Sequence, residues 1–214
     1  MNTLLYIREI WRGKDLYRIL MNTECLNYAL KGKIADIGSG PNKASYHRFF
    51  KKQPGAEISA LDCATSRIDF EHDRLPYPDA GIDAVMAFNV LEHIFNYSSL
   101  LSEIRRVLKP GGRVYGATPF LVGYHPDPKD FWRYTGSALQ NIFESNGFKE
   151  IQIKILGRGP FIAGYSQIEF LFPRPVKLAV LPGLFLLDWI FYKIRPKTNR
   201  QKFALGLFFM LTKG

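Results

Sequence analysis

The sequence predicts an α/β fold built on a doubly wound, mostly parallel β-sheet. Three observations support this prediction. A short apolar strand at residues 33–37 runs into a glycine turn at 38–40, a second strand at 57–61 ends at an acid, and a third apolar strand at 82–88 precedes a helical segment. Strands that alternate with helices are typical of βαβ units, which place successive strands parallel in one sheet.

The composition is that of one globular domain. The chain has 214 residues, of which 47% are hydrophobic and 22% charged, and this is enough for a single α/β domain with a full core. Its two cysteines, Cys25 and Cys63, have no metal-ligand spacing and indicate reduced thiols. The charged residues near the N-terminus do not suit a signal peptide. We therefore expect a cytoplasmic protein.

The N-terminal segment has the apolar spacing of helices. Leucine and isoleucine recur at helical intervals over residues 4–30, and Gly13 can divide the segment into two helices. We expect residues 1–31 to form a helical cap on the core. Two roles stay open for it, packing alone or packing together with closure over a substrate.

The glycine turn can receive a ligand. Glycine is needed there because the backbone must turn tightly and a ligand must approach main-chain atoms without a Cβ in the way. Asp36, at the carboxyl end of the first strand, can accept hydrogen bonds or pair with a cationic ligand. The run at 42–50 predicts a helix leaving the turn. Alone, such a turn is a weak signal.

Polar residues follow the second and third strands. The interval from Gly38 to Asp62 suits a βαβ unit whose second strand places an acid against a nucleoside ribose. The third strand ends at Asn89, and His93 follows shortly after it. Because a parallel sheet gathers its ligands at the carboxyl ends of its strands, we expect these side chains to face one crevice.

The second half of the chain continues the alternation. The expected elements are a helix at 100–108, a strand at 113–117, a helix at 136–144 capped by Thr135 and stopped at Gly147, and a strand at 148–156.

Taken together, several segments carry a family resemblance. In order, these are DIGSG at 36–40, the acid Asp62, LPYPD at 75–79, FNVLEHI at 88–94 and RVLKPGGRV at 106–114. This series resembles the class I S-adenosylmethionine-dependent methyltransferases, and among them the type 11 methyltransferase domains, over roughly residues 33–156. The resemblance implies a Rossmann-like, seven-stranded, mostly parallel sheet with an antiparallel last strand, and S-adenosyl-L-methionine as cofactor.

The resemblance also divides the chain. After the cap, residues 32–156 would be the cofactor-binding core and residues 203–214 the last, antiparallel strand. Residues 157–202 would then be an apolar, basic insertion between the last two strands, starting at the active-site edge of the sheet.

The same resemblance implies roles for individual residues. The residues expected to bind the cofactor are Asp36, Gly38, Ser39 and Gly40 at its amino acid end, Asp62 at the ribose, Cys63 and Glu71 near the adenine, and Asn89 below the methionine moiety. Asp69 competes with Glu71 for its role. Asn42 stands where the family commonly has a third glycine, which leaves the detail of the turn open.

A nicotinamide-binding site is the natural rival, since it also uses an acid after the second strand. It needs a G-x-G-x-x-G turn, whose third glycine allows close helix packing. Here that position is Lys43. A carboxylate such as Asp36 beside the methyl donor also suits the donor's cationic groups, so the sequence favours the methyl donor.

A polar and aromatic loop follows the strand at 113–117. The segment HPDPKDFWRYT, residues 125–135, resembles the H-x-x-P-x-D-x-W-R-x-T segment of methyltransferases often found with polysaccharide and natural-product pathways. Two interpretations stay open. Arg133 pairs with Asp130 or Asp127 and the aromatics pin the loop, or His125 and Tyr134 meet the acceptor while Arg133 binds its phosphate or carboxylate.

Methyl transfer itself demands little of the protein beyond alignment. If the acceptor must lose a proton, His93 and His125 are the candidate bases, because imidazole titrates near neutrality. A positioning or helix-start role for His93 is an equal alternative. Asp130, Arg133 and Tyr134 are the candidate acceptor-binding residues, and we predict no metal ion.

The last third of the chain is both basic and apolar. Through Phe148 there are 18 basic and 16 acidic residues, and from Lys149 onward there are 11 and 3. This combination favours an anionic membrane surface over nucleic acid as a partner. The apolar stretch Leu178–Tyr192 has 15 residues, whereas a spanning helix needs about 20. We therefore expect residues 170–197 to lie on a membrane; a lid or a dimer interface is the alternative.

The sequence thus predicts an enzyme that methylates a small molecule, most simply on oxygen, with a lipid- or nucleotide-linked saccharide as the expected acceptor. Two alternatives remain, a quinone or isoprenoid methyltransferase and a cofactor-binding interaction module without catalysis. The expected location is the cytoplasm, at the inner face of a membrane.

Overall fold

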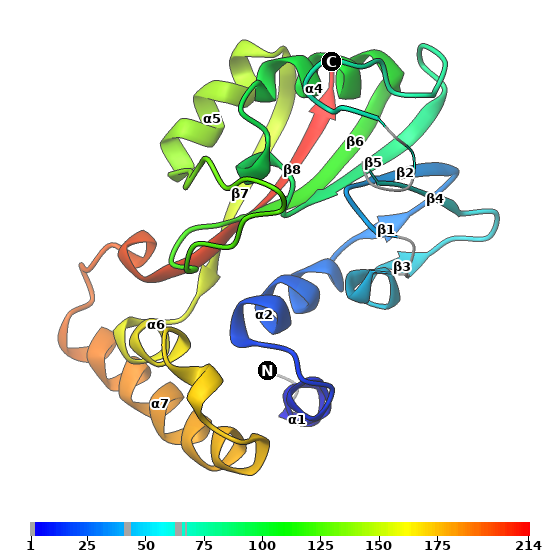
Figure 1. Ribbon diagram of the computed structural model, residues 1–214. Helices are drawn as coiled ribbons and strands as arrows, with labels where there is room; N and C mark the ends of the chain where they lie inside the picture. Colours follow the sequence, from blue (N-terminus) through cyan, green and yellow to red (C-terminus); the bar gives the residue numbers. More distant parts are fainter. Residues whose placement is uncertain (1–2, 41–43, 63–65, 67) are drawn as a thin grey trace.

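The computed structural model describes residues 3–40, 44–62, 66 and 68–214, and its centre is a six-stranded sheet with helices on both faces (Figure 1). The strand order is β4-β2-β5-β6-β8-β7. The strands are β2 (Lys33–Ile37), β4 (Glu57–Leu61), β5 (Ile82–Phe88), β6 (Leu108–Pro119), β7 (Phe148–Gly157) and β8 (Ala204–Lys213).

The sheet confirms the predicted fold class. Strands β4, β2, β5 and β6 pair in parallel, and β8 is antiparallel to both β6 and β7. Strand β7 therefore runs parallel to the first four, as expected. Within the described residues the main sheet has six of the seven strands expected. Strands β1 (Ala29–Leu30) and β3 (Lys51–Lys52) form a small separate parallel pair.

Two apolar cores cover the two faces of the sheet. Alternate residues of a strand point to opposite faces, so Met86 and Phe208 join one core while Val85 and Phe209 join the other. The first core is covered by α1 (Thr3–Trp11), α2 (Leu16–Cys25), α6 (Pro160–Ser166) and α7 (Arg174–Ile194). The second is covered by α4 (Tyr97–Val107) and α5 (Gly136–Ser145) (Figure 1).

The cap consists of two helices divided at Gly13, whose φ is +76°. Asp15 caps the second of them, since its side chain accepts a hydrogen bond from the Arg18 amide at 2.6 Å. Likewise, Thr135 Oγ1 accepts from the Ala138 amide at 3.1 Å at the start of α5. The helix boundaries expected at these positions are confirmed.

The helix expected at 42–50 is wrong. The described part of this run contains only the 3₁₀ helix η1 (Ser45–Arg48), and β3 begins at Lys51. The run stays short because the chain must enter β3 at once, and because Tyr46 and His47 both turn inward to the buried carboxylate of Asp36.

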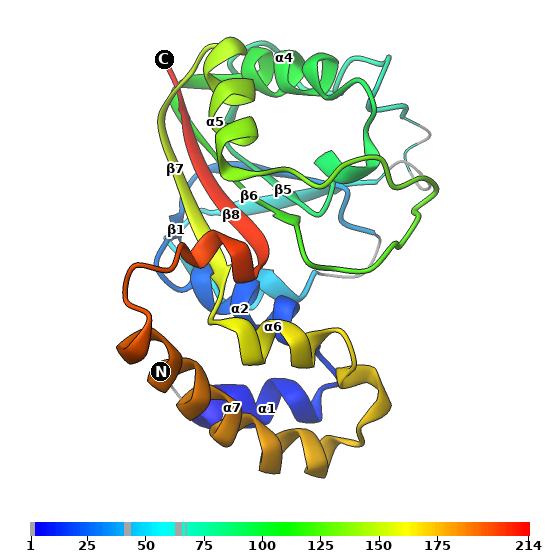
Figure 2. The ribbon, with the colours of Figure 1, turned by 90° about the vertical axis from the view of Figure 1, so that its left-hand side faces the viewer.

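The insertion forms α6, the 3₁₀ helix η3 (Glu169–Leu171), α7 and the 3₁₀ helix η4 (Arg200–Phe203). Figure 2 shows α1, α6 and α7 together at one end of the molecule, away from α4 and α5. Helix α7 has 21 residues and continues through Pro182, so it is longer than the 15-residue stretch expected. Asp188 does not interrupt it, because its carboxylate accepts from the Phe161 and Ile162 amides at the start of α6 at 2.8 and 3.2 Å.

Candidate functional site

A cavity of about 450 Å³ lies at the carboxyl ends of β2, β4 and β5. Four predicted site residues line it, namely Gly38, Asp62, Asn89 and His93. The expectation that these side chains face one crevice is therefore met. Its size is within the range typical of small-molecule sites.

Five further residues line this cavity, and the sequence did not single them out for it: Phe70, Val90, Ile94, Asp127 and Pro128. Phe70, Val90 and Ile94 are buried, so they give the cavity an apolar wall. Apolar residues are common in any core, and no sequence signal separates those that line a cavity.

The glycine turn after β2 requires glycine at its first position. Gly38 has φ of +78°, and a Cβ placed there would lie 2.5 Å from Val90 Cγ2. Its amide donates to the Leu61 carbonyl at 2.7 Å, which holds the turn against the end of β4. At Gly40 a Cβ would lie 3.6 Å from Asp62 Oδ2, so the turn and the acid after β4 are neighbours. Ser39 is buried and its hydroxyl donates to the Asp36 carbonyl at 3.3 Å.

Asp36 is fully buried and both of its carboxylate oxygens are engaged within the chain. Oδ1 accepts from the Tyr46 hydroxyl at 2.8 Å, and Oδ2 contacts His47 Nε2. Burial, together with the charge of Asp36, raises the pKa of Tyr46. The acid thus anchors the segment that follows the turn. Its expected place at the amino acid end of the cofactor stays a prediction.

Asn89 connects the cavity to the helical cap. Its backbone has φ of +55°, and its side-chain Oδ1 accepts a hydrogen bond from the Tyr17 hydroxyl at 2.5 Å. Tyr17 belongs to α2 and is buried, and burial raises its pKa. This contact joins the cap to the cavity, and closure of the cap over a substrate stays a prediction. The periodicity of the cap placed Tyr17 in a helix but gave no sign of this bond.

Glu71 and Asp69, the two acids considered for the adenine contact, have partners within the protein. Glu71 accepts hydrogen bonds from the Phe95 and Asn96 amides at 3.1 and 3.2 Å, next to the start of α4, and it does not line the cavity. Asp69 is bonded to His72 at 2.8 Å. Cys63 lies outside the described residues, as do Asn42 and Lys43 of the turn.

The loop at 125–135 is held by an internal ion pair. Arg133 binds Asp130 through two hydrogen bonds, of 2.5 and 2.7 Å, and the Asp130 side chain is 1% exposed. Arg133 lowers the pKa of Asp130. Of the two interpretations, the structure shows the pairing of Arg133 with Asp130. Tyr134 is buried and donates to the Leu91 carbonyl at 3.1 Å, so its hydroxyl braces the loop.

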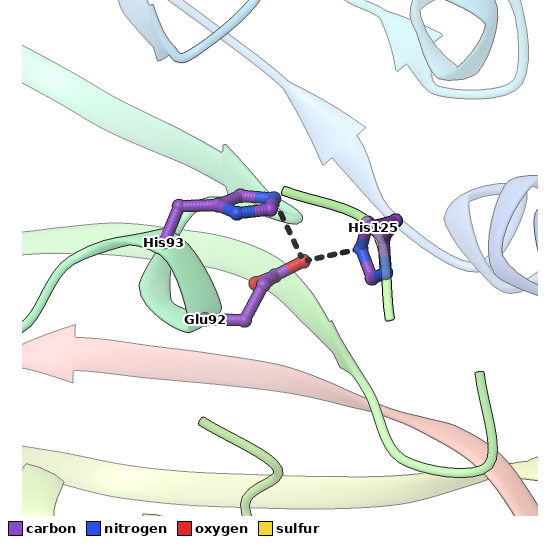
Figure 3. A group of neighbouring side chains, drawn as sticks. All are labelled: Glu92, His93 and His125. Carbon is purple, nitrogen blue, oxygen red and sulfur yellow. Dashed lines mark ion pairs between the residues drawn. The ribbon is translucent and has the colours of Figure 1, made fainter. Parts of the chain in front are cut away.

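Glu92, His93 and His125 form a cluster at the cavity wall (Figure 3). The Nε2 atoms of both histidines lie 3.9 Å from Glu92 Oε1. Glu92 is fully buried, and the neighbouring carboxylate raises the pKa of His125. The sequence offered both histidines but not Glu92. The cluster joins 3₁₀ helix η2 (Leu91–His93) to a loop about 30 residues later, a distance that sequence spacing alone does not bridge.

Comparison with known proteins agrees with this geometry. A family model described as a methyltransferase domain matches residues 36–116. A probable S-adenosylmethionine-dependent methyltransferase of Mycolicibacterium smegmatis is 33% identical over 103 residues, covering 44% of this chain and 40% of that protein. The O-methyltransferase resE of Aspergillus sclerotiorum is 30% identical over 148 residues, covering 56% of this chain and 55% of that protein. The chain thus spans about half the length of these relatives or less.

Solved structures share the fold. Phosphoethanolamine N-methyltransferase 2 of Haemonchus contortus, in complex with S-adenosyl-L-methionine, superposes with a TM-score of 0.54 at 17% identity, covering 90% of this chain and 52% of that one. The [4+2]-cyclase SpnF has the same TM-score and identity, covering 92% and 80%. Because one neighbour is a cyclase, the fold alone does not decide the reaction. The family match and the sequence relatives agree that residues 36–116 of this chain resemble the methyltransferase domains of S-adenosylmethionine-dependent enzymes.

Proposed function

We propose that the protein transfers a methyl group from S-adenosylmethionine to an oxygen of a small-molecule acceptor. The observation that carries this proposal is the convergence of Gly38, Asp62 and Asn89 on one cavity at the strand ends. In such a reaction the bond between sulfur and the methyl carbon breaks as the bond from oxygen to that carbon forms. Alignment of the two reactants supplies much of the acceleration. Relatives named as O-methyltransferases support oxygen as the accepting atom.

Titration calorimetry with S-adenosylmethionine tests the donor site. Asp62→Ala removes the expected ribose contact and should weaken donor binding by at least tenfold, because a charge-assisted hydrogen bond is worth about 1.5–3 kcal/mol. Glu144→Ala is the matched control, since this acid is exposed on α5 and does not line the cavity. Unchanged donor affinity in Asp62→Ala, with the fold intact by circular dichroism, would refute the assignment.

The surface around α7 supports an acceptor carried by a membrane. Exposed apolar side chains gather on three elements there: Leu4, Ile7 and Trp11 on α1, Phe170 and Leu171 on η3, and Leu186, Leu187, Trp189, Ile190 and Ile194 on α7. The elements are adjacent, since α1 and α7 are in contact and the rings of Tyr6 and Phe185 meet edge to face at 5.9 Å (Figure 2). Contiguous apolar surface of this kind is unusual in a soluble monomer.

Among the described residues, α7 is the one helix that could cross a bilayer by length and composition, and only 11% of its most apolar window is buried. Its contacts with α1 and α6 and the bonds from Asp188 to α6 favour a position in the membrane surface instead.

The charge of this end complements an anionic membrane. Of the three acidic residues after Phe148, Glu169 and Asp188 are buried and bonded inside the protein. The basic side chains Arg158, Lys193 and Arg200 instead line a hollow of about 590 Å³ against α7. Each also lies over an aromatic ring of α7, with the cationic atom 5.8, 5.4 and 4.5 Å from the ring centre respectively. Cations beside exposed apolar residues are the arrangement that binds phosphate headgroups.

Liposome flotation tests this part of the proposal. The full chain should float with vesicles that contain anionic lipid and remain in the soluble fraction with neutral ones at high salt. Trp189→Glu with Ile194→Glu should abolish flotation, whereas Tyr124→Glu, at an exposed aromatic residue just before the loop at 125–135, should not. Equal flotation of both variants would exclude this surface as the contact.

The acceptor class is tested by incubating the protein with isotopically labelled donor and an acceptor panel. The panel should contain lipid-linked saccharides, nucleotide-linked saccharides and quinones, with mass spectrometry as the readout. We expect label on a saccharide oxygen. Label on a quinone would move the proposal to that class, and donor binding without any turnover would favour a module without catalysis.

A further inference from the structure

The carboxylate of Glu92 lacks a hydrogen-bond partner in the part of the chain that the structure describes. Its side chain is fully buried, and neither oxygen has a donor within reach. An ionised carboxylate buried without compensation is costly, so such groups are normally paired or bind a metal. The nearest ring nitrogens, at 3.9 Å, are too distant for hydrogen bonds.

Both histidines present their Nε2 atom to this carboxylate. His93 Nδ1 lies 2.6 Å from the Lys129 carbonyl oxygen, and His125 Nδ1 lies 2.8 Å from the Gly123 carbonyl oxygen. Because a carbonyl oxygen only accepts, a proton on Nδ1 satisfies both contacts, and at His125 this contact is shorter than the one of 3.4 Å between Nδ1 and Arg133 Nη2. In a neutral imidazole the Nε2 atom is then unprotonated and faces Glu92 Oε1 (Figure 3). A backbone carbonyl that holds Nδ1–H in this way is the usual support of a metal-binding histidine.

The spacing of the three atoms suits an ion. They lie within 4.8 Å of one another, so a point equidistant from them is about 2.5 Å or less from each, and zinc ligands lie at about 2.0–2.2 Å. Small rotations of the side chains close this difference. His93 and His125 also contact each other edge to face, with ring centres 5.3 Å apart, which brings both rings to the same point.

We propose that Glu92, His93 and His125 bind one divalent transition-metal ion of the zinc type at the wall of the methyl-donor cavity. Two imidazoles and one carboxylate favour such an ion over Mg²⁺ or Ca²⁺, which prefer oxygen ligands. Three protein ligands leave at least one coordination position, as in catalytic zinc sites. His93 lines the cavity, so that position is accessible from it.

The chemical role of the ion rests on the proposed function, although its binding does not. An acceptor hydroxyl bound to the ion would have a lowered pKa and lose its proton to water. The resulting oxygen would attack the methyl carbon, forming the carbon–oxygen bond as the carbon–sulfur bond breaks. Under this proposal His93 and His125 hold the ion, and neither serves as the general base.

Calorimetry with the metal-stripped, full-length chain tests the site. We expect one Zn²⁺ bound per chain, and one Co²⁺ with visible absorption bands of low-symmetry coordination. Glu92→Gln and His125→Ala should each weaken Zn²⁺ binding by at least 100-fold. His72→Ala is the control, because His72 is exposed and pairs with Asp69 instead. Circular dichroism verifies that each variant is folded, and His125→Ala, at a partly exposed loop residue, keeps the test usable if Glu92→Gln does not fold.

Three results would overturn the proposal. The first is no uptake of Zn²⁺ or Co²⁺. The second is unchanged metal binding in folded Glu92→Gln and His125→Ala. The third is histidine NMR signals that titrate identically with and without Zn²⁺, which would mean that a proton, and no metal ion, lies between the histidines and Glu92. Donor binding measured on the same samples separates the two proposals. A chain that binds donor but no metal ion loses only the metal site, and a chain that binds the ion but no donor loses the proposed function.

Discussion

Replacement of Gly38 by alanine tests why the turn after β2 requires glycine. Two separate costs are expected. The first is backbone strain, because a residue with a Cβ in the left-handed region costs about 1–2 kcal/mol and Gly38 has φ of +78°. The second is a clash, because the new methyl group would lie 2.5 Å from Val90 Cγ2, and overpacking of a buried site costs about 1–3 kcal/mol. Together they predict a loss of about 2–5 kcal/mol in the free energy of unfolding.

Gly55 provides a matched control for the first cost. It has φ of +79°, and no atom lies within 4 Å of the position where its Cβ would be. Gly55→Ala should therefore cost only the strain, about 1–2 kcal/mol. Val90→Ala measures the second cost, because it removes the clashing atom. In a double-mutant cycle, Gly38→Ala and Val90→Ala should be coupled by about 1–3 kcal/mol in the favourable direction.

The assay is urea unfolding followed by circular dichroism, with all four variants and the parent at one pH. A Gly38→Ala variant that unfolds at the same urea concentration as Gly55→Ala would refute the clash. Additive effects of Gly38→Ala and Val90→Ala would do the same. Either result would mean that the turn moves away from η2 at no cost, so that Gly38 is required only for its φ.

Two further predictions concern an ion pair within α4 and the hydrogen bond between the cap and Asn89. Arg106 donates to both oxygens of Glu103 at 2.7 and 2.8 Å and lowers the pKa of Glu103 below its usual 4.5. The ionised form thus stabilises the fold above about pH 4.5, and this contribution disappears as the pH falls through the folded-state pKa. Glu103→Gln should lower the free energy of unfolding by about 1.5–3 kcal/mol at pH 7. In urea unfolding, this difference from the parent should shrink towards pH 3. A difference that does not change with pH would contradict the pairing. Tyr17→Phe removes the hydrogen bond to Asn89, so it should cost about 1 kcal/mol in the free energy of unfolding and lower the donor affinity measured by calorimetry. Tyr28→Phe, on a tyrosine that bonds Glu24 instead, should leave the donor affinity unchanged. Equal donor affinity in the parent and both variants would mean that the cap takes no part in the site.

Local patterns were enough for the order of the elements and for the position of the cavity. Glycine or an acid directly after an apolar run marks the carboxyl end of a strand. Parallel strands bring their carboxyl ends to the same edge of the sheet. Gly38, Asp62, Asn89 and His93 therefore reach the same cavity, although they are spread over 56 positions. Capping residues such as Thr135 also act within one turn of helix, which is why their effect is visible in the sequence.

The sequence alone did not assign the ion-pair and hydrogen-bond partners of side chains that are far apart along the chain. The sequence left Arg133 with two possible uses, and the structure shows its pairing with Asp130, whose side chain is 1% exposed. The sequence did not indicate that Glu71 accepts hydrogen bonds from the amides of Phe95 and Asn96. The roles expected of Arg133 and Glu71 toward ligands stay predictions. A charged side chain binds whichever complementary group the fold brings within about 3 Å, and that choice depends on the whole chain.

By itself, the sequence determined that a parallel sheet would bring a glycine turn and an acid to one cavity, because strand periodicity and turn chemistry are properties of neighbouring residues. Only the tertiary structure decided that Tyr17 of the cap reaches Asn89, that α1 packs against α7 with exposed apolar side chains on both, and that Glu92 faces two histidines. These features join segments that lie far apart along the chain. Their distances follow from how helices pack on the sheet, and no local pattern records that packing.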